Sequence, residues 1–211
     1  MSDAILEFAE QFLRADADAL DIGANQGLYT KSFATIARKV LAFEPNPELA
    51  QLLRVKNENS ANVTVVEAAA SDRVGETTFY IDTRPGLGAV ASSLNVLSDL
   101  AAANMIRPIK VAVTTIDKQV RDTALRPSLV KIDVEGHEPA VVRGMKETIS
   151  CFRPALIFEF WETWWALGYR EMFDYLNPIY RMIRLGTGED AYAYYTSRTG
   201  AGTADIGCVP R

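Results

Sequence analysis

Short runs of apolar residues alternate along most of the chain with segments in which apolar residues recur at helical spacing. Apolar runs bounded by Gly, Pro, Asn or Asp are typical of buried strands, and a spacing of three or four residues is typical of amphipathic helices. The pattern predicts strands over 20–22, 40–43, 62–67, 76–82, 109–115, 129–133 and 155–160. It predicts helices over 4–13, 29–37, 47–58, 139–149 and 161–176, and an antiparallel strand pair over 179–185 and 191–197. Because strands and helices alternate, we expect an α/β fold with a mostly parallel sheet and helices on both faces.

Length, composition and charge narrow the classes of protein that this chain can be. A chain of 211 residues is expected to form one domain over 1–211, with its first helix within 1–15. The 22 Lys and Arg against 27 Asp and Glu give a formal net charge of −5, so we expect neither a nucleic-acid nor a membrane partner. No apolar run approaches the ~18 residues of a membrane span. The two cysteines, Cys151 and Cys208, are expected to be reduced thiols of a cytoplasmic protein.

A glycine loop follows the first predicted strand and precedes a helix, in the order Asp21, Gly23, Asn25 and Gly27. Glycine at such a turn permits positive φ and lets a ligand approach the backbone. The G-x-x-x-G spacing differs from the G-x-G-x-x-G of dinucleotide folds, and no Gly-Lys-Ser/Thr follows to make a phosphate-binding loop. An acid beside the loop suits a cationic ligand such as a sulfonium or an amino group. The alternative is a tight turn without a ligand.

A second acid, Glu44, ends the second predicted strand 23 residues after Asp21. A carboxylate at this place in doubly wound folds accepts hydrogen bonds from both hydroxyls of a ribose. The alternative is a charge favoured by the dipole of the next helix. The glycine loop and the acid together predict a cofactor that contains adenosine.

Titratable residues are densest at 131–138, where an apolar strand ends and a helix begins. In an extended chain Asp133, Glu135 and His137 would point to one side. His137, the one histidine of the sequence, could serve as a general base because its unperturbed pKa is ~6.5. Two alternatives stay open for this segment. In the first, its acids are only stabilised by the dipole at the N-terminus of the helix that follows. In the second, Asp133, Glu135 and His137 bind a divalent metal together with Glu159.

Several of these segments resemble the FkbM-type family of class I S-adenosylmethionine-dependent methyltransferases. The matching segments cover 20–160 and include LDIGANQGLYT, VLAFEPNP, VTVVEAAASDRVGETTFYI, SSL, VAVTTIDKQV, LVKIDVEGHEPAVVRGM and RPALIFEF. The resemblance implies a seven-stranded sheet with an antiparallel last strand, and 20–160 as the cofactor-binding core. It also implies methyl transfer from S-adenosylmethionine to a hydroxyl of a small molecule or a carbohydrate.

The resemblance assigns roles to individual residues. Asp21, Gly23, Asn25 and Gly27 would line the methionine part of the cofactor, and Glu44 would hold its ribose. Ser71 or Asp72 would contact the adenine. Asp133 would lie near the reacting methyl group, with Glu135 and His137 beside it as catalytic residues.

The acceptor side is expected from two regions. The segment 83–108 lacks a strong period and is expected to be a loop over the substrate, with Ser92 and Ser93 in it. Glu159 and Trp161 end the strand over 155–160, where Trp161 could stack on a sugar. The region 161–211 is expected to form a helix and a hairpin. Its aromatic residues at helical spacing belong to the core or to an interface in a homo-oligomer.

Two other functions compete with methyl transfer. A methyltransferase-like module that only binds is disfavoured by the intact glycine loop, Glu44 and the Asp133 cluster. A nicotinamide-dependent oxidoreductase is disfavoured by the glycine spacing. The acceptor, the need for a metal and the oligomeric state are left open by the sequence.

Overall fold

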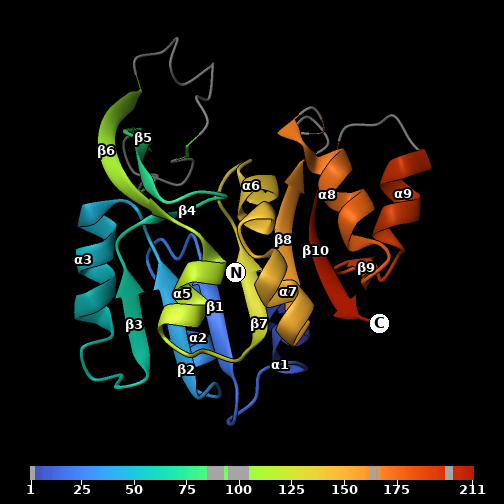
Figure 1. Ribbon diagram of the computed structural model, residues 1–211, viewed down its shortest axis with the longest axis horizontal. Helices are drawn as coiled ribbons and strands as arrows, with labels where there is room; N and C mark the ends of the chain where they lie inside the picture. The colour runs from blue at the N-terminus through green and yellow to red at the C-terminus, as the bar shows by residue number, and fades with distance from the viewer. Residues whose placement is uncertain (1–2, 85–92, 95–104, 162–164, 166, 198–201) are drawn as a thin grey trace.

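The computed structural model describes residues 3–84, 93, 94, 105–161, 165, 167–197 and 202–211 (Figure 1). Its main sheet has seven strands in the order β3-β2-β1-β7-β8-β10-β9. These strands are β1 (Asp18–Ile22), β2 (Lys39–Phe43), β3 (Val63–Val66), β7 (Pro127–Ile132), β8 (Ala155–Trp161), β9 (Tyr180–Arg184) and β10 (Thr203–Pro210). The last strand, β10, is antiparallel to both of its neighbours, and the pairs from β3 to β8 are parallel. The expected fold class is confirmed.

Helices cover the two faces of this sheet because successive side chains of a strand point to opposite faces. Leu20 and Ile22 of β1 belong to the core cluster beneath α5 to α9, whereas Ala19, the residue before Leu20, belongs to the cluster beneath α1 and α2. The described helices are α1 (Asp3–Glu10), α2 (Leu28–Ala34), α3 (Pro47–Lys56), α5 (Ile116–Asp122), α6 (Glu138–Arg143), α7 (Lys146–Phe152), α8 (Tyr169–Leu176) and α9 (Ala191–Ser197). Every residue of β1 is buried, including its two acids, Asp18 and Asp21.

A smaller sheet stands beside the carboxyl ends of β1 and β2 (Figure 1). Its order is β4-β6-β5, from β4 (Ala69–Ala70), β5 (Gly75–Asp82) and β6 (Ile106–Thr114). The predicted substrate loop over 83–108 connects β5 to β6, and most of it lies outside the described residues. Within it, Ser93 exchanges two backbone hydrogen bonds with Tyr80, which adds a short bridge to β5.

The structure corrects three predicted elements. The helix expected over 139–149 is two helices, α6 and α7, separated at Gly144. A Cβ at Gly144 would lie 2.0 Å from the carbonyl oxygen of Ser71, so this close approach requires glycine. Of the helix expected over 161–176, the described α-helical part is α8 from Tyr169, which follows Gly168 with a φ of +92°, and Trp161 belongs to β8 instead.

The third correction concerns the predicted hairpin. Residues 191–197 form the helix α9, whose first turn is capped by Asp190 accepting from the backbone N–H of Ala193 (2.8 Å). Tyr195 of this helix packs on Phe160 with ring centroids 4.5 Å apart. The alternating Ala and Tyr residues resembled a strand, but β9 pairs instead with β10.

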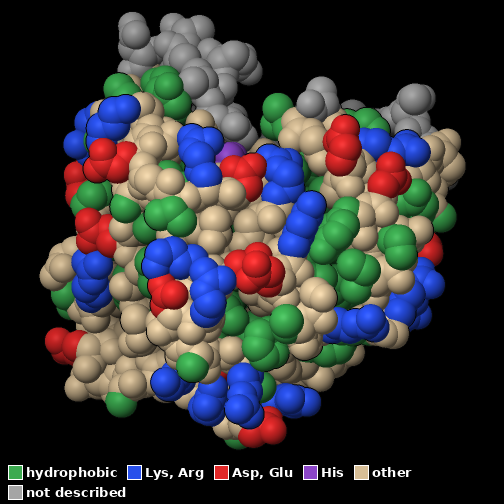
Figure 2. Space-filling view, in the orientation of Figure 1, with side chains coloured by type: hydrophobic (Ala, Val, Ile, Leu, Met, Phe, Trp, Pro, Cys, Tyr) green, Lys and Arg blue, Asp and Glu red, His purple; other side chains and the backbone are tan. Residues whose placement is uncertain are grey.

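The described surface mixes charges of both signs. On the face in Figure 2, Lys and Arg side chains alternate with Asp and Glu side chains. Within the described ranges, no helix combines the length and the apolarity needed to cross a membrane.

Candidate active site

Three loops meet where the adjacent strands β2, β1 and β7 end, the edge at which open α/β sheets bind ligands. They border a cavity of about 150 Å³. Its lining includes Gly23, Asn25, Glu44, Pro45, Leu49, Ala68, Ala69, Ala70, Asp133, Val134, Glu135 and His137. A second cavity of about 660 Å³ shares Gly23, Asn25 and Asp133 with the first and extends along the glycine loop to Tyr29 and Lys31. The two spaces therefore adjoin each other at the glycine loop.

The glycine loop packs directly against the end of β7. Gly23 has a φ of +78°, and a Cβ there would lie 1.8 Å from the carbonyl oxygen of Asp133. Gly27 also has positive φ, and its Cβ would lie 2.3 Å from Leu53 Cδ1. Gly23 is required for backbone packing and Gly27 for its positive φ, so the tight turn serves the fold as well as any ligand.

Glu44 is buried at the end of β2 and faces the cavity. Its Oε2 accepts from the backbone N–H of Asn25 (2.8 Å), and its Oε1 accepts from that of Asn46 (2.9 Å). Burial raises the pKa of Glu44 to about 7, against the opposing effect of these two hydrogen bonds. Each carboxylate oxygen can accept a second hydrogen bond, so Glu44 can bind a pair of hydroxyls.

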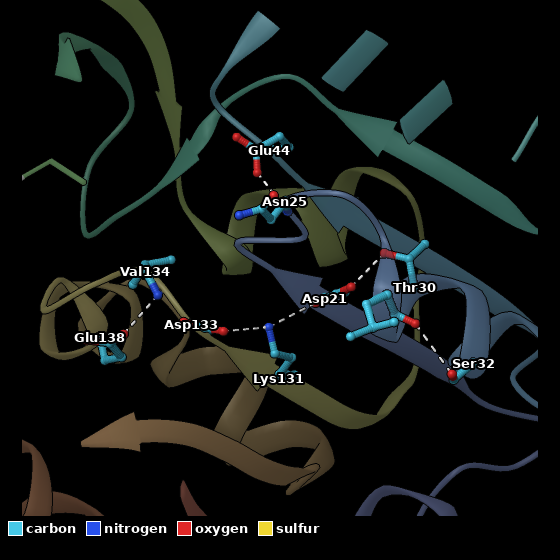
Figure 3. A network of polar contacts seen from close by, with 10 residues as sticks. Asp21, Asn25, Thr30, Ser32, Glu44, Lys131, Asp133, Val134 and Glu138 are labelled. Carbon is cyan, nitrogen blue, oxygen red and sulfur yellow. Dashed lines mark hydrogen bonds and ion pairs between the residues drawn. The ribbon is translucent and has the colours of Figure 1, made fainter. Parts of the chain in front are cut away.

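Asp21 lies behind the glycine loop and does not line either cavity. Its Oδ2 accepts from Thr30 Oγ1 (2.6 Å), and its Oδ1 lies 3.6 Å from Lys131 Nζ without a hydrogen bond (Figure 3). The sequence placed Asp21 at the methionine part of the cofactor. In the structure it is a fully buried group that faces a lysine.

Lys131, to which the sequence analysis gave no role, lies at the centre of the network in Figure 3. Its Nζ is 3.1 Å from Asp133 Oδ2 and 4.6 Å from the ring centroid of Tyr29. Burial lowers the pKa of Lys131, but the carboxylates of Asp133 and Asp21 raise it by more, so the ammonium stays charged. A buried lysine between two acids of different strands depends on strand pairing and has no local sequence signal.

Three carboxylates come together beside the cavity. One oxygen each of Asp133, Glu135 and Glu159 lies within 4.8 Å of the others. Burial, followed by the charges of Asp133 and Glu159, raises the pKa of Glu135 to about 8. Burial and Asp133 also raise the pKa of Glu159. Such a group can hold and release a proton near neutral pH.

His137 does not belong to this carboxylate group, contrary to the extended arrangement expected for Asp133, Glu135 and His137. The chain turns after β7, with φ values of +54° at Glu135 and +90° at Gly136, and this turns His137 away. His137 Nε2 instead lies 2.9 Å from the hydroxyl of Ser71, and burial lowers the pKa of His137 to about 4. The four proposed metal ligands are therefore not brought together as a set.

The residues expected at the adenine form a separate polar group. Ser71 is buried next to His137, and Asp72 accepts from Arg143 Nε (3.0 Å). Neither Ser71 nor Asp72 lines the first cavity, whereas His137 does. His137 thus connects Ser71 to the cavity.

The residues expected on the acceptor side lie in different surroundings. Ser93 is buried, and its hydroxyl donates to the carbonyl oxygen of Glu135 (2.9 Å), so it braces the loop after β7. Ser92 lies outside the described residues. Trp161 at the end of β8 is 40% exposed, two residues beyond Glu159.

A buried glutamate supports the loop after β7 from the other side. The oxygens of Glu138 accept from the backbone N–H groups of Val134 (2.8 Å) and Gly136 (3.0 Å). The hydroxyl of Tyr169 donates to the same carboxylate. In the sequence, Glu138 is one of the acids of 131–138 for which stabilisation at a helix N-terminus was one alternative. The hydrogen bond from Tyr169 to Glu138 depends on how α8 packs against this loop, so it has no signal in the local sequence.

Comparisons with known proteins show which family this chain belongs to. The family model described as "Methyltransferase FkbM domain" matches residues 21–185. The "2-O-methyltransferase NoeI" of Sinorhizobium fredii is 29% identical over 147 residues, which are 65% of this chain and 60% of that protein. The "Hexuronic acid methyltransferase AglP" of Haloferax volcanii is 30% identical over 153 residues, 69% of this chain and 55% of that protein. This chain therefore spans little more than half the length of these relatives.

A solved structure shows the same fold. The crystal structure of methyltransferase FkbM from Methylobacillus flagellatus KT superposes with a TM-score of 0.59 and 17% identity. The superposition covers 97% of this chain and 47% of that one.

Proposed function

Because the chain belongs to the FkbM methyltransferase family, we propose that it transfers a methyl group from S-adenosylmethionine to a hydroxyl oxygen of a carbohydrate. The observation that carries this proposal is a cavity with a buried diol-binding acid, Glu44, on one side and the carboxylates of Asp133 and Glu135 on another. The first group suits a ribose, and the second suits proton transfer.

The residues present fit the methyl donor. Leu49 and the three alanines 68–70 offer an apolar wall for an adenine, and His137 with Ser71 adds polar groups. Glu44 would hold the ribose hydroxyls. The second cavity along the glycine loop, with Gly23 and Asn25, gives room for the methionine part.

When bound, the donor supplies the methyl group: its S–CH3 bond breaks as the bond to the acceptor oxygen forms, leaving neutral S-adenosylhomocysteine. The protein has to receive the hydroxyl proton. We assign this proton to Glu135, acting with Asp133, because the raised pKa of about 8 makes its ionised carboxylate a stronger base than an ordinary glutamate. We assign His137 to cofactor binding, because its pKa of about 4 makes it a weak base.

The carbohydrate acceptor is supported by the relatives, whose names describe a 2-O-methyltransferase and a hexuronic acid methyltransferase. Trp161, exposed at the end of β8 beyond Glu159, offers an apolar ring face on which a sugar can stack. We propose Glu159 and Trp161 as acceptor contacts.

The first test is calorimetric titration of the protein with S-adenosylmethionine and with S-adenosylhomocysteine, with and without magnesium. We expect saturable binding of both, independent of magnesium. A magnesium requirement would instead make the Asp133, Glu135 and Glu159 group a metal site. Absence of binding in folded protein would refute the proposed function.

The second test measures transfer of labelled methyl groups to a panel of neutral and acidic sugars, with wild type and Glu135→Gln. We expect Glu135→Gln to lower kcat about 100-fold, because a positioned base contributes about that much. Its dissociation constant for S-adenosylhomocysteine should stay close to that of the wild type. Glu76→Gln, on an exposed position of β5, is the matched control. Binding without transfer to any acceptor would favour the silent binding module.

A further inference from the structure

One buried cation lies directly behind the proposed reaction centre. The side chain of Lys131 is 4% exposed, and its ammonium lies between Asp133 of the loop after β7 (3.1 Å) and Asp21 of β1 (3.6 Å). The ring of Tyr29 from α2 packs over the same ammonium at 4.6 Å. Figure 3 shows Lys131 directed at both carboxylates. These contacts fix the ammonium from three elements.

Asp133 connects this interior cation to the cavities. Its side chain is 38% exposed, and it lines both cavities. Its Oδ2 accepts from Lys131, while its Oδ1 has no donor among the described residues. One oxygen of Asp133 is therefore bound to the buried ammonium of Lys131, and the other is open to a ligand.

The surroundings are otherwise strongly acidic. Besides Asp21 and Asp133, the carboxylates of Glu44 after β2, Glu135 after β7 and Glu159 on β8 all interact with the charge of Lys131. Asp205 on β10, which is paired with Glu159 across the sheet, also does. A positively charged donor entering this region meets carboxylates from several strands, and an unrestrained carboxylate would pair with it.

We propose that Lys131 is a positioning residue that holds the Asp133 carboxylate back from the positive charge of the methyl donor and leaves its second oxygen for the acceptor hydroxyl. This inference rests on the proposed function. The donor loses its positive charge during transfer. Tight pairing of Asp133 with that charge would therefore stabilise the ground state more than the transition state and would slow the reaction.

The test uses the difference of one positive charge between S-adenosylmethionine and S-adenosylhomocysteine. The ratio of their dissociation constants reports the electrostatic potential at the sulfur and needs no acceptor. In Lys131→Met we expect the preference for S-adenosylmethionine to rise about tenfold, because a nearby cation is lost and Asp133 is released. Lys131→Arg should keep the wild-type ratio within about twofold, because it keeps the charge. Lys118→Met, at an exposed lysine of α5, is the matched control.

Lys131→Met leaves Asp21 buried without a cation, and this can prevent folding. The double variant Asp21→Asn with Lys131→Met removes that buried charge and still releases Asp133. If the single variant does not fold, the double variant should show the raised preference for S-adenosylmethionine.

The kcat of the same variants provides a second test. With a carbohydrate acceptor we expect Lys131→Met to lower kcat about 100-fold, the loss typical of a displaced catalytic group. Lys131→Arg should retain most of the wild-type kcat. A folded variant without Lys131 that keeps both the wild-type ratio and the wild-type kcat would overturn the role of Lys131 alone. A wild type that binds both ligands but methylates no acceptor would contradict the proposed transfer, and the binding ratio would still decide the role of Lys131. A wild type that binds neither ligand would refute both.

Discussion

At the scale of single residues, His137 lies apart from the carboxylates of Asp133, Glu135 and Glu159 to which we assign proton transfer. It bonds to Ser71 and has a pKa of about 4, so it is neutral at physiological pH. We predict that His137→Ala weakens binding of S-adenosylhomocysteine about three- to tenfold, the range expected for one lost hydrogen bond. Calorimetry on His137→Ala, Ser71→Ala and the double variant should show non-additive losses, since the two residues act as a pair.

The pH dependence of kcat distinguishes a binding role of His137 from that of a general base. If His137 were the general base, His137→Ala would remove the ionisation on the acidic side of the profile and leave binding intact. We expect this ionisation to disappear in Glu135→Gln and to persist in His137→Ala.

The sequence predicted those site residues that follow directly from strand ends. Glu44 and Asp133 each come within a residue of a buried strand, so the parallel topology alone brings them to one edge. The contact between Ser71 and His137 spans 66 residues, and the position of Lys131 depends on two strand pairings. Such contacts depend on three-dimensional packing and leave no pattern in the local sequence.

At the scale of elements, the sequence pattern predicted the buried strands correctly. It failed where tertiary packing determines the conformation of a segment. The central strands β1 and β7 are almost entirely buried, and their apolar residues make them recognisable in the sequence. Residues 191–197 have alternating small and aromatic side chains typical of a strand, yet they form α9. Tyr195 packs edge-on against Phe160, and Asp190 caps the helix, so tertiary contact and capping decide the conformation.

The contact of α8 with the loop after β7 yields a prediction at the same level. Tyr169, the first residue of α8, donates its hydroxyl to the buried carboxylate of Glu138, which caps two backbone N–H groups of that loop. We predict that Tyr169→Phe lowers the free energy of unfolding in urea by about 1–2 kcal/mol, because a buried acceptor loses its donor. Tyr192→Phe removes an exposed hydrogen bond to Asp174 and should cost less than about 0.5 kcal/mol. Equal losses in the two variants would contradict a supporting role for Tyr169.

For the whole molecule, the buried acids of the site predict how stability depends on pH. Burial raises the pKa of Glu44 to about 7, of Glu135 to about 8 and of Glu138 to about 7, from an ordinary value of 4.5. The folded protein thus binds more protons than the unfolded chain between pH 4.5 and 8. The stabilisation from these groups is complete below pH 4.5 and is lost as the pH rises through 7 to 8. His137 acts in the opposite direction only below pH 6.5, because its pKa falls from 6.5 to about 4.

The range from pH 6.5 to 8.5 therefore isolates the glutamates. We predict that the free energy of unfolding, measured in urea, decreases across this range by an amount of order 1–3 kcal/mol. Glu135→Gln should flatten part of the decrease, because glutamine does not titrate, whereas Glu76→Gln should keep the wild-type slope. A stability that rises from pH 6.5 to 8.5 would show that these carboxyls are ionised in the folded protein at neutral pH. The increase in the pKa of Glu135 by burial would then be wrong, and with it the reason for choosing Glu135 over the other carboxylates as the proton acceptor. The stability of the unliganded protein can thus test the proposed chemistry before an acceptor is known.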